Sequence, residues 1–103
     1  MPWILLLFAG LLEIVWAVAM KQTAGFTRLW PTAIMGVAMI GSFGLLAMAM
    51  RDLPLGTAYT IWTGIGAVGA FTVGILFLGE ALTPMRIGAA TLIVTGLVIM
   101  KLA

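Results

Sequence analysis

Hydrophobic residues follow one another along this chain in four long runs, which short polar connections separate. The runs cover approximately residues 2–20, 31–50, 55–78 and 85–101. Each is close to the ~20 residues that a helix needs to cross the hydrocarbon core of a bilayer. We therefore predict an all-α membrane protein with four transmembrane helices, in which residues 1–103 form a single four-helix transmembrane domain.

The residues between the runs are typical of helix boundaries. Pro31, Pro54 and Pro84 each stand at or just before a predicted helix start, where a missing backbone N–H costs little. Thr83 is expected to cap the fourth helix. The first run resembles the core of a signal peptide, but no Lys or Arg precedes it and Glu13 interrupts it, so we expect a retained helix.

Composition agrees with a membrane protein, because 64% of the residues are hydrophobic and only 8% are charged. Cysteine and histidine are both absent, which excludes disulfides and thiol chemistry and argues against a metal site. We expect no cofactor. The net charge of +2 is too small to indicate a nucleic-acid partner.

The charges of the connecting loops are almost balanced. If the loops alternate sides, Lys21, Arg28 and Arg86 face one side of the membrane, and Arg51 and Lys101 face the other. Orientation follows the Lys/Arg bias of the loops, and here the bias is minimal. The sequence leaves two alternatives open: one orientation fixed by a weak bias, or insertion in both orientations.

A glycine pattern in the third run imitates a dinucleotide-binding motif. Residues 64–69 read G-x-G-x-x-G, but that motif requires a strand before it and a helix start at its glycines. Here it lies inside a run long enough to span the bilayer. We expect Gly64 and Gly66 to allow close helix contact or a bend, and Gly10 to open space in the first helix.

Glu13 is the one charged residue that lies inside a hydrophobic run rather than at an edge. An ionisable group at the centre of a spanning helix costs about 2.5–3.5 kcal/mol on insertion scales. Such groups face a bundle interior or a wet cavity, and they mark functional sites more often than not. The plainer alternative is a protonated side chain that makes one interhelical hydrogen bond.

Aromatic and hydroxyl side chains are spaced to accompany Glu13. Trp16 follows it by three positions on the same helical face, and Tyr59 and Trp62 share a face of the third helix in the same way. Ser42 is the main polar side chain inside the second run, where its hydroxyl can orient the Glu13 carboxylate. Two alternatives involve no function. The aromatic side chains would lie at the membrane interface, and the Ser42 hydroxyl would bond a carbonyl of its own helix.

A buried carboxylate with tryptophan and tyrosine nearby suits an organic cation. The carboxylate supplies charge, and the rings supply flat faces for cation–π contact. Because no other acid lies in the predicted membrane region, Glu13 has to accept both the proton and the cation. Competition of two ions for one site is the minimum requirement for antiport.

The residues of the site also resemble a known family. The whole chain is similar to the small multidrug resistance transporters: four short helices, Glu13 in the first, G-F-T-R-L-W-P at 25–31, and P-x-G-T-A-Y-x-x-W-T-G-I-G at 54–66. Within that family, Trp16 after Glu13, together with W-T-G-I-G at 62–66 and the terminal Lys101, resembles the guanidinium-exporter subtype.

The resemblance implies an antiparallel, dual-topology homodimer in the bacterial inner membrane, which exchanges guanidinium-type cations for protons. It implies Glu13 as the binding residue for substrate and proton. The residues lining the site would be Trp16, Ser42, Tyr59 and Trp62. Dimer contacts would be made in the fourth helix by Ala89, Leu92, Ile93 and Gly96, where Ala89 stands in place of a glycine that the family often has.

Two other functions fit parts of the same pattern. A broad exporter of quaternary ammonium or other lipophilic cationic drugs would also use a membrane carboxylate among aromatic rings. A proton-binding rotor subunit of a rotary ATPase is a small chain with one membrane carboxylate as well, but it would have two helices with the acid in the second.

Overall fold

The computed structural model describes residues 2–103 and contains four helices: α1 (Pro2–Gln22), α2 (Leu29–Ala49), α3 (Leu55–Phe77) and α4 (Pro84–Leu102). Each is long and apolar enough to cross a membrane. The prediction of an all-α chain with four transmembrane helices is therefore confirmed.

The helix bounds differ from the hydrophobic runs by up to two residues. α1 continues through the polar Lys21 and Gln22, which are good helix formers, so the helix extends two residues beyond its hydrophobic run. α2 begins at Leu29, and Pro31 is its third residue, still within the first turn where no backbone N–H is needed. α3 ends one residue early, at Phe77, and Gly79 follows in a left-handed conformation (φ +72°).

α4 begins as predicted. The Oγ1 atom of Thr83 accepts a hydrogen bond of 3.1 Å from the backbone N–H of Arg86, and Pro84 is the first helical residue. This N-cap satisfies one of the amides that a helix start leaves unpaired. Thr83 and Pro84 thus fix where the last connection ends.

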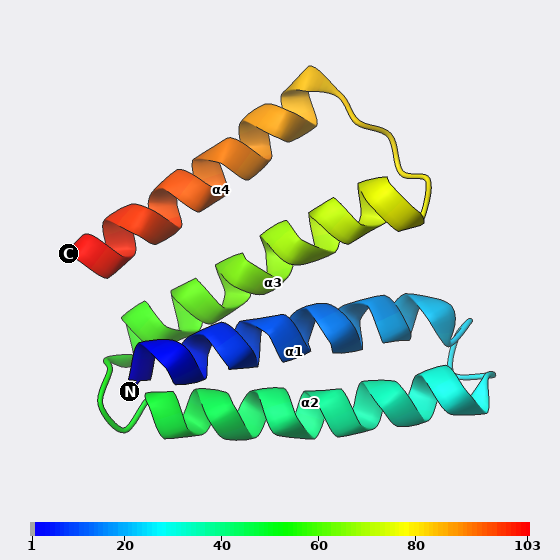
Figure 1. Ribbon diagram of the computed structural model, residues 1–103, viewed down its shortest axis with the longest axis horizontal. Coiled ribbons are helices and arrows are strands. Elements are labelled where there is room, and N and C mark those ends of the chain that lie inside the picture. Colours follow the sequence, from blue (N-terminus) through cyan, green and yellow to red (C-terminus); the bar gives the residue numbers. More distant parts are fainter. Residues whose placement is uncertain (1) are drawn as a thin grey trace.

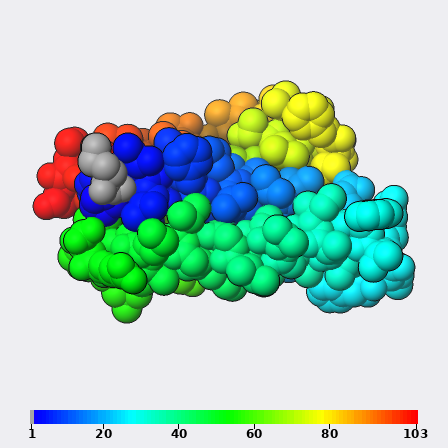
Figure 2. All heavy atoms as spheres, turned by 60° about the horizontal axis from the view of Figure 1, so that its bottom comes forward, coloured from blue at the N-terminus to red at the C-terminus, as the bar shows by residue number. Residues whose placement is uncertain are grey.

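The helices lie side by side in the order α4, α3, α1, α2 (Figure 1). α1 packs against both α2 and α3, whereas α4 packs against α3 alone. The molecule is a slab of 40 × 34 × 16 Å. The N-terminal end of α1, the C-terminal end of α4 and the α2–α3 connection share one end of this slab (Figures 1 and 2).

The core lies where α1, α2 and α3 meet near that end. Its buried members are Leu6, Ala9, Leu46, Ala49, Ala58, Ile61 and Trp62. Three of the seven are alanines, one on each of the three helices, and such small residues let the backbones approach closely. No described residue of α4 is buried, so this helix adds no member to the core.

Candidate functional site

Glu13 projects from the middle of α1 against α3. Its carboxylate packs directly on Gly66, where an added Cβ atom would overlap the carboxylate carbon and oxygen. The Oε1 atom is buried and accepts no hydrogen bond from the described residues 2–103. Buried polar atoms are normally hydrogen-bonded, so this oxygen is an acceptor that the monomer leaves unused.

Trp16 provides the matching donor. It lies one turn beyond Glu13 on α1, and its indole Nε1 is also buried without a hydrogen-bond partner within the described chain. The two unpaired side-chain atoms of the described chain are therefore one acceptor and one donor, three residues apart on one helix. Leaving such a group unsatisfied costs about 1–3 kcal/mol.

Ser42 is fully buried in α2 and ties three helices together. Its hydroxyl donates a hydrogen bond of 2.6 Å to the carbonyl of Ala9 in α1. The same oxygen accepts a hydrogen bond of 2.9 Å from the indole Nε1 of Trp62 in α3. Ser42 was expected either to orient the Glu13 carboxylate or to bond back to its own helix, and in the structure its partners are Ala9 and Trp62.

A row of aromatic rings crosses α1, α2 and α3. Tyr59 and Trp62 contact each other on α3 with ring centroids 5.6 Å apart, as their spacing predicted. Phe43 of α2 then lies 5.6 Å from Trp62 and 6.2 Å from Trp16. Phe43 therefore lies between the two tryptophans. Its ring meets theirs at the tilted or edge-on angles that aromatic pairs prefer.

Phe43 was absent from the residues expected at this site. The available signal was its position next to Ser42, because a residue adjacent to a buried polar group lies near the same helix interface. A phenylalanine in a hydrophobic run carries no polar feature that distinguishes it from a lipid-facing side chain. Its 46% exposure leaves part of the ring free.

The glycines of the site each meet a different neighbour. An added Cβ at Gly10 would collide with Ile65, and one at Gly64 would collide with Leu97 of α4. All three of Gly10, Gly64 and Gly66 are buried. α3 nonetheless runs as one continuous helix past Gly64 and Gly66, so these residues serve close packing here.

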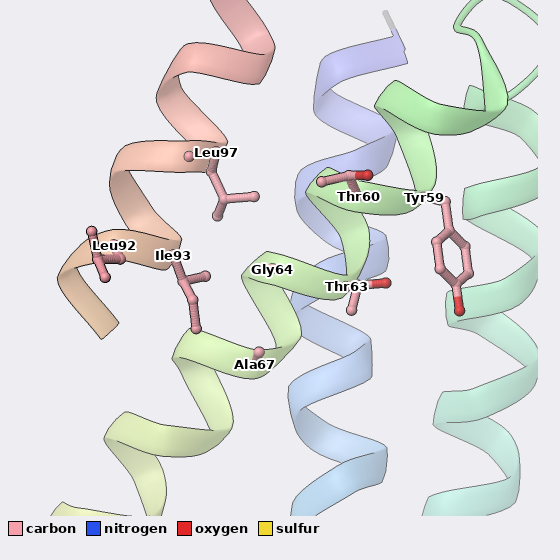
Figure 3. A pocket seen from close by; sticks show the side chains of 9 residues that line it. Tyr59, Thr60, Thr63, Gly64, Ala67, Leu92, Ile93 and Leu97 are labelled. Atoms are coloured by element: carbon pink, nitrogen blue, oxygen red, sulfur yellow. The ribbon is translucent and has the colours of Figure 1, made fainter. Parts of the chain in front are cut away.

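Tyr59 also borders an open groove of about 430 Å³ between α3 and α4. In Figure 3 the side chains of Ile93 and Leu97 point toward α3, and Thr63 lies between them and Tyr59. The groove is lined by Tyr59, Thr60, Thr63, Gly64, Ala67, Leu92, Ile93, Gly96 and Leu97.

The residues expected at the dimer contact all lie exposed on α4. Leu92 is 74% exposed and Ile93 41% exposed, and both line the groove with Gly96. Ala89 borders a smaller hollow beside Phe71. An added Cβ at Gly96 would meet no atom within 4 Å. These four residues are thus only partly covered by the rest of the described chain.

Glu13 is the one acidic residue within the four helices, because Asp52 and Glu80 lie in the connections between them. Within residues 2–103, no cluster of three or more potential metal ligands occurs. The chemistry of this site therefore rests on one carboxylate, one free indole N–H and several aromatic faces.

Four apolar spanning helices that carry a single membrane carboxylate are typical of a small membrane transporter. The chain belongs to the Small Multidrug Resistance family, whose model matches residues 1–100. The resemblance noted from the sequence is thereby confirmed. The family consists of secondary transporters, which excludes the rotor subunit.

Several relatives match the chain over its full length. It is 57% identical to a guanidinium exporter of Escherichia coli (strain K12), with all of this chain and 98% of that protein covered. Guanidinium exporters of Citrobacter freundii and Salmonella typhimurium show the same identity and coverage.

Proposed function

We propose that this protein exports guanidinium-type cations across the bacterial inner membrane in exchange for protons. We also propose that it acts as an antiparallel homodimer. The observation on which the proposal rests most is the buried, unpaired Oε1 atom of Glu13 beside the free indole of Trp16. The full-length relatives, which are guanidinium exporters, support the same substrate class.

The chemistry of guanidinium matches these groups. It is a planar cation whose N–H donors can engage both oxygens of a carboxylate, and its flat face can stack on an aromatic ring. Glu13 offers the oxygens, and Trp16, one turn further along α1, belongs to a row of aromatic rings with Phe43 and Trp62. An alkylammonium would bind as a point charge and would use this geometry less fully.

Proton coupling follows from the scarcity of acids. A proton and a cation both need Glu13, because it is the one carboxyl group in the four helices. Binding of one then excludes the other. Release of a proton on one side of the membrane, followed by capture of the cation, would give exchange.

A second, inverted copy would complete the site. The exposed contact face of α4 (Ala89, Leu92, Ile93 and Gly96) offers a place for that copy, and a glycine at position 96 permits close approach of two helices. The balanced loop charges favour insertion in both orientations. Two copies related in this way would reproduce the inverted repeat that larger transporters contain in one chain.

The decisive test is transport in proteoliposomes. With an imposed pH gradient, the protein should accumulate or release guanidinium, and Glu13→Gln should abolish both the cation flux and the coupled proton flux. Gln keeps the size of the side chain but cannot carry charge or exchange a proton. A pH-driven guanidinium flux that persists in Glu13→Gln would overturn the proposal.

The same assay separates the alternative drug exporter. Guanidinium and a bulky, lipophilic quaternary ammonium compound are compared at equal concentration. A guanidinium-type exporter should move guanidinium faster, because only that cation can donate two hydrogen bonds to Glu13. Faster transport of the bulky compound would favour the drug exporter.

A further inference from the structure

A second groove opens on a different face of α3. Residues of α1, α3 and α4 line it, near the C-terminal end of α4. It has a volume of about 320 Å³. Seven of its eight lining residues are apolar, among them the exposed Leu7 and Val98, and Lys101 supplies its one charged group. Glu13 is not among its lining residues, so the groove is distinct from the proposed cation site.

Lys101 is held at the mouth of this groove. Its Nζ atom lies 5.2 Å from the centre of the Trp3 ring, in a cation–π contact that joins the end of α4 to the start of α1. A ring covers one side of an ammonium group, and the remaining N–H donors stay available to an anion. The side chain is exposed, so an anion at the membrane surface can reach it.

We propose that this groove binds an anionic phospholipid of the surrounding bilayer. An acyl chain would lie along the apolar walls between Leu7 and Val98, and the phosphate would contact the Lys101 ammonium. Tryptophan favours the headgroup level of a membrane, so Trp3 places the mouth of the groove at that depth. The arrangement thus pairs an apolar slot with a cation at the height where a phospholipid carries its negative charge.

Charge complementarity selects the anionic lipid over a neutral one. One Lys or Arg near an anionic surface favours binding by about fivefold. The α2–α3 connection lies at the same end of the molecule (Figure 1). It contains Arg51, which does not line the groove. Arg51 is therefore the matched control for a charge that acts on the surface in general.

The test uses the fluorescence of Trp3 in vesicles that contain phosphatidylglycerol or phosphatidylcholine with brominated acyl chains, which quench nearby indoles. The chain has four tryptophans, so the Trp3 contribution is taken as the difference from Trp3→Phe. Brominated phosphatidylglycerol should quench Trp3 at an about fivefold lower mole fraction than brominated phosphatidylcholine. Lys101→Gln should remove this preference, and Arg51→Gln should retain it.

Three results would overturn the proposal: equal quenching by the two lipids in the unmodified protein, a preference that survives Lys101→Gln, or an equal loss in Arg51→Gln. Absence of Trp3 quenching by either lipid would also overturn it, since the groove would then be covered by protein such as a second copy. Val98→Phe, which fills the groove without touching the charge, should weaken quenching by both lipids. Unchanged quenching in Val98→Phe would contradict an acyl chain inside the groove.

Discussion

Ser42 links three helices through a single hydroxyl group, because it donates to Ala9 of α1 and accepts from Trp62 of α3. The Ala9 carbonyl lies one helical turn before Glu13, so the hydroxyl fixes the backbone next to the acid. Ser42 also sets the orientation of the Trp62 ring. Its influence on the cation site would thus pass through its neighbours.

Removing this hydroxyl should destabilise the fold. Ser42→Ala leaves the Trp62 indole N–H buried without an acceptor, which costs about 1–3 kcal/mol. We expect a lower thermal unfolding midpoint in detergent for Ser42→Ala. The control is Thr91→Val, because the Thr91 hydroxyl bonds its own helix at the Ile87 carbonyl (2.8 Å) on an exposed face. Equal midpoints for the two variants would contradict the linking role of Ser42.

Phe43 is a residue of the site that the sequence alone does not distinguish. Its ring touches Trp16 and Trp62, yet the sequence around it reads as one continuous hydrophobic run. A polar residue in such a run is conspicuous because burial of polar groups is costly. An apolar residue is not, so only its contacts identify it.

Helix α3 presents glycines to different partners within one turn. Gly66 faces the Glu13 carboxylate and Gly64 faces Leu97 of α4. The acid and the outer helix are thus positioned by neighbouring residues of one element. A methyl group added at each position should therefore have different consequences.

Gly66→Ala should impair transport while leaving the fold largely intact, because the added methyl displaces the flexible end of Glu13. Loss of one charge-assisted hydrogen bond, worth about 1.5–3 kcal/mol, corresponds to about 10- to 150-fold weaker cation binding. Guanidinium affinity and the pH dependence of transport are measured together. An unchanged affinity and pH profile in Gly66→Ala would contradict this prediction.

Gly64→Ala is the companion variant. Its methyl group meets Leu97, so it should loosen the packing of α4 on α3 at a cost of about 1–3 kcal/mol from overpacking. The expected sign is a lower unfolding midpoint with the pH profile retained. A shifted pH profile in Gly64→Ala would show that the two glycines do not act separately.

For the whole molecule, the exposed face of α4 is the feature that a monomer does not explain. Gly96→Leu should leave the single chain folded, because an added Cβ there meets nothing within 4 Å. It should nevertheless weaken the proposed dimer by preventing close helix approach. Native mass spectrometry in detergent measures the dimer fraction. Thr91→Leu serves as the control, because position 91 lies about 140° around the helix from Gly96. An unchanged dimer fraction in Gly96→Leu would contradict the proposed dimer contact at this residue.

Orientation in the membrane is tested with single cysteines, since the natural chain has none. Asp52→Cys places a thiol in the α2–α3 connection, and Ala81→Cys places one at an exposed position of the α3–α4 connection. A membrane-impermeant reagent added to one side should label about half of each variant if both orientations insert at the balance that the loop charges indicate. Complete labelling of one variant and none of the other would establish a single orientation.

The sequence by itself determined the four spanning helices, the isolated acid and the family, because hydrophobic runs, costly polar groups and motif spacing are all local properties of the chain. Tertiary structure alone decided which side chains meet: Ser42 with Ala9 and Trp62, Phe43 between two tryptophans, and Gly66 against Glu13. Helices in a bilayer are apolar on every face, so periodicity does not reveal which face packs. Close approach and hydrogen bonding between helices choose that face, and they arise only when the chain is folded.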